Sequence, residues 1–145
     1  TEQLKGQVGR KAIVVVTDGV DQGSRYTRER AIEAAQKADA VIYGVHYVDH
    51  MFYGRYGGGF GAPGDGDLRR MAEATGGRVF SIDRGMSLDQ AYKQIEEEMR
   101  SQYAIGYVPT NQIKDGAYRK LDLKLSNKDF KVQARKGYYA ERSEQ

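Results

Sequence analysis

The strongest constraint on the fold of this chain is an apolar run that ends in a carboxylate. Residues 11–19 read Lys-Ala-Ile-Val-Val-Val-Thr-Asp-Gly, so the branched side chains of Ile13 to Val16 stand shortly before Asp18. Such an uninterrupted run is typical of a parallel strand that is covered on both faces. In open α/β sheets ligands bind beyond the carboxyl ends of the strands, where Asp18 would lie and Gly19 would let the backbone turn tightly. Asp18 therefore either holds a metal ion or an anion-binding water, or only caps the loop before the next helix.

The composition excludes several classes of protein. The 145 residues are enough for one domain with a real core. The chain has no cysteine, which rules out disulfides, thiolate nucleophiles and zinc–thiolate sites. No apolar run approaches the roughly 18 residues of a membrane span. The net charge of +3 is uneven, with 13 Lys/Arg against 15 Asp/Glu in residues 1–99 and 10 against 5 in residues 100–145.

Strand and helix patterns alternate along residues 11–100. After the first strand, the pattern predicts a helix over Tyr26–Ala38, capped by Ser24 or Thr27, and then a strand over Ala40–Val48. A helix over Asp67–Thr75 follows, ended by Gly76-Gly77, and then a strand over Arg78–Ile82. A capping box at Ser87 and Gln90 begins the last helix. The last helix carries an apolar stripe of Leu88, Ala91, Tyr92, Ile95 and Met99. This order predicts an α/β fold with a mostly parallel sheet.

After Arg100 the period of the apolar residues changes to two. Apolar and polar residues alternate over 103–107, 121–125 and 130–134, and Asp115-Gly116 and residues 127–129 supply turns. Strict alternation favours an antiparallel meander with one buried and one wet face. We therefore divide the chain into an α/β unit over 1–101, an antiparallel β extension over 102–140 and a disordered tail over 141–145.

Together these segments resemble a von Willebrand factor type A domain, and most closely the bacterial von Willebrand A-related proteins described from acidobacterial genomes. The blocks that carry the resemblance are residues 11–24, 68–80, 95–109, 118–121 and 134–139, read in this order. Each block alone is weak, whereas their order and spacing are fairly specific and span nearly the whole chain. The resemblance implies a Rossmann-like, doubly wound sheet and an exported or cell-envelope location in a bacterium.

The resemblance also implies a metal-ion-dependent adhesion site built from three loops. The first loop supplies Asp-x-Ser-x-Ser, the second a Thr, and the third an Asp that Asp18 matches. No Asp-x-Ser-x-Ser occurs in this chain, which therefore looks like the C-terminal half of such a domain plus its extension. In the complete domain Mg²⁺, Mn²⁺ or Ca²⁺ would be held with Asp18 acting through a water. One carboxylate cannot supply the octahedral oxygen set that Mg²⁺ needs, so we expect no bound metal in this chain.

The function implied by the resemblance is protein–protein interaction of the adhesion type, without catalysis. In the complete form the open metal position would take a carboxylate from a protein partner. The competing hypothesis is a Mg²⁺-dependent hydrolase or phosphoryl-transfer domain that uses Asp18 as metal ligand or nucleophile. The sequence offers such an enzyme neither a catalytic base nor a phosphate cradle. A third hypothesis is a structural domain whose metal site has decayed.

Other candidate sites compete with Asp18. Asp49 and Asp83 also follow predicted strands, so the three carboxylates could together hold a hard cation, although loop carboxylates commonly only cap turns. His46 and His50 are spaced as a possible metal pair, although buried or loop histidines are commoner.

Two further segments have a simpler interpretation. The glycine-rich residues 54–66 lack the pattern of a phosphate-binding loop and are interpreted as a mobile surface loop. The Lys/Arg and aromatic residues of the tail superficially suit nucleic acid. The alternation instead places these charges on the solvent-exposed face of strands, so we expect no nucleic-acid partner.

The strand over Lys11–Thr17 poses a problem of its own. In the family it lies next to the strand that bears Asp-x-Ser-x-Ser, so in this chain it would become a sheet edge. An uncharged apolar edge is a template for pairing with another chain. The missing half could cover it, two copies could pair or swap strands, or the extension could fold back across it. We favour pairing between chains.

Overall fold

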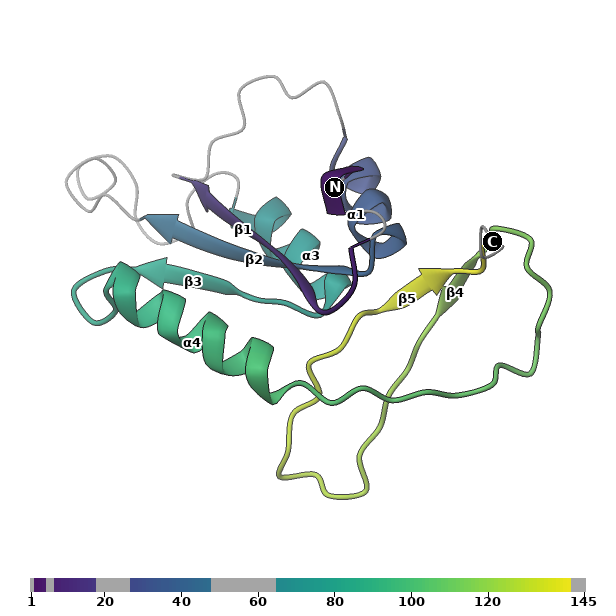
Figure 1. Ribbon diagram of the computed structural model, residues 1–145. Coiled ribbons are helices and arrows are strands. Elements are labelled where there is room, and N and C mark those ends of the chain that lie inside the picture. The colour runs from purple at the N-terminus through teal and green to yellow at the C-terminus, as the bar shows by residue number, and fades with distance from the viewer. Residues whose placement is uncertain (1, 5–6, 18–26, 48–64, 142–145) are drawn as a thin grey trace.

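The computed structural model describes residues 2–4, 7–17, 27–47 and 65–141 of the chain (Figure 1). Their elements are η1 (Glu2–Leu4), β1 (Lys11–Thr17), α1 (Arg28–Lys37), β2 (Ala40–Tyr47), α3 (Asp65–Thr75), β3 (Val79–Ile82), α4 (Leu88–Ser101), β4 (Tyr118–Lys120) and β5 (Gly137–Tyr139). The fold is mixed α/β, with a three-stranded parallel sheet and a separate two-stranded antiparallel sheet. The predicted order of elements up to α4 is confirmed.

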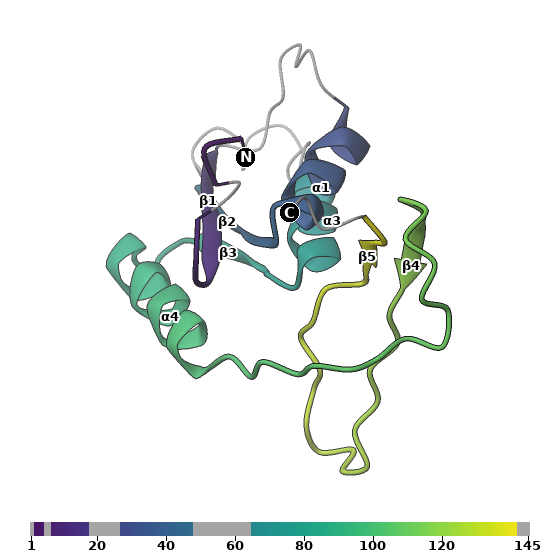
Figure 2. The ribbon, with the colours of Figure 1, turned by 45° about the vertical axis from the view of Figure 1, so that its right-hand side comes forward.

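The central strand of the parallel sheet is β2, in the order β1-β2-β3. In register, Ile13 lies beside Ile42 on one side, and Gly44 lies beside Val79 on the other. Helices α1 and α3 cover one face of the sheet and α4 covers the other, as the two views in Figures 1 and 2 show. The core on the α4 face joins side chains of β2, β3 and α4, namely Tyr43, Val45, Phe80, Ile82, Ala91 and Ile95.

The helix boundaries follow local signals that the sequence already carries. Thr27 caps α1 by accepting a hydrogen bond from the Arg30 amide at 3.4 Å. Ser87 and Gln90 form the predicted capping box of α4, with bonds of 3.2 and 2.7 Å. Gly76 follows α3 with a φ of +89°, a conformation that costs glycine little. These caps confirm the predicted signals. They could be predicted because each depends only on residues that are near neighbours in the chain.

The carboxyl end of α4 is tied to the start of β1 by Arg10. Its guanidinium donates to the backbone carbonyls of Met99 at 2.5 Å, Arg100 at 3.2 Å and Gln102 at 2.7 Å. The last carbonyls of a helix have no partner within the helix, and a cation there also opposes the negative end of the helix dipole. Arg10 therefore holds α4 against the same end of the sheet at which β1 begins.

The strand β1 differs from its prediction in one respect. The apolar run predicted cover on both faces, yet Val14 is 37% and Val16 is 57% exposed. In register these two residues stand beside Tyr43 and Val45, so they lie on the α4 face of the sheet. Helix α4 packs over β2 and β3, and the described residues cover Val14 and Val16 only in part. Within the described residues β1 is thus the predicted sheet edge.

The apolar stripe of α4 is only partly buried for the same reason. Ala91 and Ile95 are buried, whereas Leu88 and Tyr92 are 42% and 43% exposed. The stripe was predicted from spacing alone, which defines a helix face but not how far the sheet beneath that face extends.

The β extension is smaller than predicted. Its strands are the three-residue β4 and β5, in which Tyr118 lies beside Tyr139. The alternating segments 103–107, 121–125 and 130–134 lie outside strands, and many of their apolar side chains are exposed, including Tyr103, Ile105, Leu123 and Phe130. The predicted buried face is therefore wrong for the described residues. Alternation makes a segment amphipathic, but a strand forms only where a partner strand is also present.

The hydroxyl of Thr75 replaces a missing strand partner for β2. The pairing of β2 with β3 begins only at Gly44, so the Ile42 amide donates instead to Thr75 Oγ1 at 2.9 Å. Thr75 is 4% exposed, and its hydroxyl lies 3.0 Å from the carbonyl oxygens of Met71 and Ala72. The last turn of α3 is in this way fixed to the central strand.

We expect Thr75→Val to lower the free energy of unfolding by about 1–3 kcal/mol, because the isosteric side chain leaves the buried Ile42 amide unsatisfied. Urea unfolding followed by circular dichroism measures the change. The matched control is Thr110→Val at an exposed threonine, for which we expect a change within about 0.5 kcal/mol. Equal stability of the two variants would show that the Ile42 amide does not depend on Thr75.

Candidate functional site

The candidate site is the edge of the parallel sheet at which its strands end. Because β1, β2 and β3 are all parallel, Thr17, Tyr47 and Ile82 end at the same edge. Ligands of α/β proteins bind outside this edge. Helices α1 and α3 each follow one of these strands in a βα unit.

Only part of the predicted metal set falls in the described residues. Asp18, Asp49 and His50 lie outside them, so the predictions for these three side chains are not decided by the structure. Asp83 is described, and its Oδ1 accepts the backbone amides of Gly85 at 2.7 Å and Met86 at 3.0 Å. Its carboxylate therefore shapes the turn between β3 and α4, which is the simpler of the two interpretations given above.

His46 lies inside the sheet. It is 3% exposed in β2, between Thr17 and Ser81 in the register of the strands. Within the described ranges there is no group of three or more His, Asp or Glu residues that could hold a metal ion. His46 is accordingly a core residue of the central strand in the part of the chain that the structure describes.

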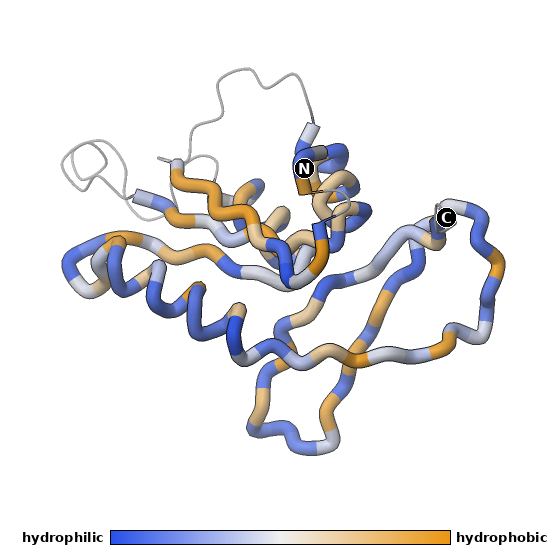
Figure 3. The backbone as a smooth tube through the Cα atoms, viewed as in Figure 1, coloured by the Kyte–Doolittle hydropathy of each residue, from blue (hydrophilic) through white to orange (hydrophobic). Residues whose placement is uncertain are grey.

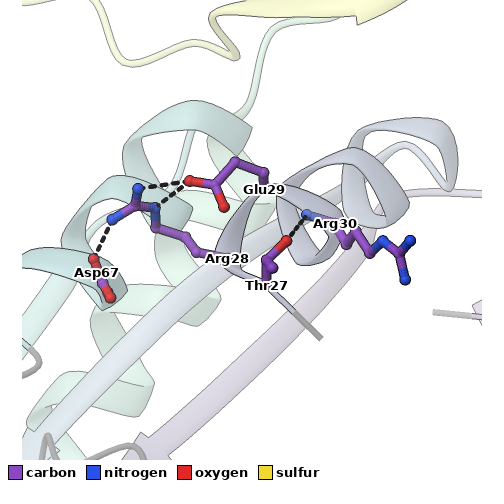
Figure 4. A network of polar contacts seen from close by, with 5 residues as sticks. All are labelled: Thr27, Arg28, Glu29, Arg30 and Asp67. Atoms are coloured by element: carbon purple, nitrogen blue, oxygen red, sulfur yellow. Dashed lines mark hydrogen bonds and ion pairs between the residues drawn. The ribbon is translucent and has the colours of Figure 1, made fainter. Parts of the chain in front are cut away.

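The described polar cluster at this edge joins the first turns of α1 and α3 (Figure 4). The Arg28 guanidinium donates to Glu29 Oε1 at 2.6 and 3.1 Å and also contacts Asp67 Oδ1. Arg30 extends away from this network. Arg28 thus connects the first turns of the two helices.

The electrostatics of the cluster follow from these contacts. The pKa of the Glu29 carboxyl is lowered, first by a hydrogen bond from its own backbone amide and then by the Arg28 guanidinium. The pKa of Arg28 is raised by Glu29 and then by Asp67. Both carboxylates are mostly exposed, so the network positions two helix starts and contributes little to stability. The sequence pattern gives no signal for this network, because Arg28 and Asp67 are 39 positions apart.

A second polar site lies between α1 and the β4–β5 sheet. It is a shallow cleft of about 280 Å³ lined by Gln36, Lys37, Asp39, Arg135, Tyr138, Tyr139 and Glu141. Lys37 pairs with Glu33 at 3.0 Å and Glu141 at 2.8 Å, and Arg135 pairs with Asp39 at 2.6 Å.

The cations of this cleft are held by the protein itself. Lys37 also lies over the Tyr139 ring at 5.3 Å, and its pKa is raised to about 12, first by Glu141 and then by Glu33. With both cations engaged in this way, the cleft fixes the β4–β5 sheet to α1 and is a poor site for an anion.

No protein-family model, curated protein or solved structure matches the chain. Among the described residues, no helix combines the length and the apolar character needed to cross a bilayer.

We expect Arg28→Ala to raise the pKa of Glu29 part of the way toward its ordinary value, because the backbone hydrogen bond to the carboxylate remains. Carboxyl chemical shifts followed through an acid titration by NMR measure this pKa. The matched control is Arg30→Ala, two positions further along α1, which should leave the Glu29 titration unchanged. If both variants gave the same titration curve as the parent chain, the role assigned to Arg28 would be wrong.

Proposed function

We propose that this chain is a non-enzymatic protein-interaction module, built as the part of a von Willebrand factor type A-like domain that carries the third metal-binding loop. The observation that carries the proposal is the place of Asp18 in the sequence. It comes directly after Thr17, the last residue of β1, and β1 belongs to a parallel sheet with helices on both faces. This arrangement is the one in which a strand end presents a carboxylate to a ligand.

The proposed mechanism of binding uses a divalent cation in the complete domain. Mg²⁺, Mn²⁺ or Ca²⁺ would take oxygen ligands from three loops, with Asp18 contributing through a water. A metal held with few charged ligands stays electrophilic and accepts a carboxylate from the protein partner. The Arg28 network would hold the starts of α1 and α3 in place beside this loop. An exported or cell-envelope location fits this adhesive function.

The coding sequence upstream of Thr1 tests the proposal directly. We expect it to encode an Asp-x-Ser-x-Ser loop on a strand that would neighbour β1. An upstream sequence that lacked both this motif and a further α/β pattern would overturn the assignment to the family.

We expect the 145-residue chain alone to bind Mn²⁺ no better than weakly, because a single strand-end carboxylate cannot complete an octahedral oxygen set. Isothermal titration calorimetry with Mn²⁺ measures this, with Asp18→Asn as the matched variant. A stoichiometric site tighter than the micromolar range would contradict the expectation. If Asp18→Asn, Asp49→Asn and Asp83→Asn each weakened such a site, the three-carboxylate alternative would replace the proposed one.

The exposed edge of β1 gives a second experiment on the same module. In a complete domain the neighbouring strand would pair with β1, and in this chain we propose that a second copy does so. In an antiparallel pair centred on Val14, the exposed Val14 of one copy would meet Val14 of the other, and each exposed Val16 would meet Ala12. With Val14 at the centre, Lys11 of one copy stands opposite Thr17 of the other, so no like charges meet.

We expect light scattering at low micromolar concentration to give twice the 16.3 kDa mass of one chain. Val14→Lys should return the chain to a monomer, because a charge on an edge strand opposes strand pairing. Val8→Lys, at a fully exposed position outside β1, is the control and should remain a dimer. A monomeric parent chain whose amides over 13–16 exchange rapidly would show that the edge is tolerated unpaired.

A further inference from the structure

We propose that residues 121–136, called the tail hairpin below, form a docking arm that pairs with an extended acidic polypeptide. The hairpin leads from β4 through a turn at 127–129 back to β5, and its two legs run side by side in both views (Figures 1 and 2). It lies apart from β1 and takes no part in the proposed metal edge, so this inference stands independently of the proposed function.

The side chains of the tail hairpin have the pattern of a strand that is half buried. Apolar residues alternate with polar ones along both legs, as the colours of Figure 3 show. Leu123 is 47%, Leu125 is 46% and Phe130 is 67% exposed. Adjacent side chains of an extended chain point to opposite sides, so each leg has an apolar side and a charged side. The apolar side lacks the cover that this pattern normally receives.

The backbone of the tail hairpin is open in its middle. At the base, the Leu121 amide donates to the Lys136 carbonyl at 2.9 Å, and at the tip the Asp129 amide donates to Asn127 Oδ1 at 2.9 Å. Between these points, the described residues 122–135 take part in no backbone–backbone hydrogen bond. The Asp129 amide is occupied by Asn127, and the backbone of 134–135 lies against Gly76. The other amides and carbonyls of this range are open to an added strand, which is how extended peptides dock on many domains.

The hairpin is nevertheless attached firmly to the body of the protein. The Lys136 amide donates to the Ala74 carbonyl at 3.1 Å. Gln133 Nε2 donates to the Gly76 carbonyl at 3.0 Å and to Glu98 Oε2 at 3.1 Å. One leg is thus held at the end of α3, and a partner meets a surface already in place. Binding to such a surface costs less ordering than binding to a free tail.

The charge of the tail hairpin selects the partner. It contains five Lys/Arg and two Asp. Arg135 pairs with Asp39 and Lys124 pairs with Asp122, whereas Lys128 and Lys131 flank the exposed Phe130 near the tip and provide the charge offered to a partner. A second copy would bring equal positive charges together, which opposes self-pairing through this surface. Nucleic acid would use stacked aromatic rings, whereas the exposed apolar side chains here are mainly Leu and Val. An extended polypeptide in which apolar and acidic residues alternate could bury the apolar side of the hairpin and pair its carboxylates with the lysines. Its backbone could at the same time hydrogen-bond with the open backbone of the hairpin.

The probe is a fluorescein-labelled peptide of alternating Val and Glu, ten residues long, titrated with the full chain and followed by fluorescence anisotropy. We expect saturable binding that weakens as salt is raised. Hydrogen exchange should show new protection over residues 122–135 in the complex. A Val-Lys peptide of equal length and a peptide with the same Val and Glu residues in two blocks should bind about tenfold more weakly or not at all.

Two variants and their matched controls separate the two sides of the hairpin. Leu123→Ser with Phe130→Ser removes apolar surface, and Lys128→Glu with Lys131→Glu reverses the charge. Each pair should weaken binding by about tenfold or more. Val8→Ser and Lys93→Glu, at exposed positions elsewhere, should leave the affinity unchanged. All of these side chains are exposed, so the variants should keep the circular dichroism of the parent.

Three results would overturn the proposal. The first is equal binding of the Val-Glu and Val-Lys peptides. The second is displacement of the Val-Glu peptide by a short oligothymidylate at lower concentration than by unlabelled peptide, which would assign the surface to nucleic acid. The third is strong protection of the amides 122–135 in the free chain, which would show that the two legs pair with each other.

Discussion

The structure depends above all on the burial of β2 from both faces. Tyr43 and Val45 are fully buried beneath α4, while Gly44 lies so close to Leu68 of α3 that a β-carbon there would meet that side chain. The residues of a buried central strand must be apolar or small, and their amides must find partners. Pairing with β1 and β3 satisfies most of β2, and Thr75 supplies the acceptor for Ile42 where β3 has not yet begun.

The helices cover the parallel sheet unevenly, and this leaves apolar side chains of the outer strand exposed. Helix α4, held at its end by Arg10, lies over β2 and β3, so Val14 and Val16 on the outer strand remain exposed on that face. The tail hairpin is a second surface with exposed apolar side chains, and it carries more Lys/Arg than Asp. The two surfaces differ in charge and position, so the two proposed interactions can be tested separately.

Functional side chains at the carboxyl edge could be predicted only where the strand ends themselves were predictable. The apolar run of 11–17 defined β1, and with it the place of Asp18 in the sequence, which remains a candidate ligand outside the described residues. Asp83 appeared equivalent in the sequence, yet its Oδ1 accepts the amides of Gly85 and Met86 in the turn before α4. Arg28 carried no signal, because its partner Asp67 belongs to another helix.

The sequence by itself determined what depends on neighbours along the chain: the apolar strands, the capping box at Ser87, a cap at Ser24 or Thr27 before α1 and a glycine stop at 76–77 after α3. The structure selects Thr27 as the cap and gives Gly76 the left-handed conformation. Tertiary structure decided which of these faces found cover. The alternation of residues 121–125 does not specify whether a second strand lies beside them, and the stripe of α4 does not specify how far the sheet extends beneath it. Local conformation is set by dihedral preferences and hydrogen bonds between near neighbours, whereas burial and pairing require surfaces from distant parts of the chain.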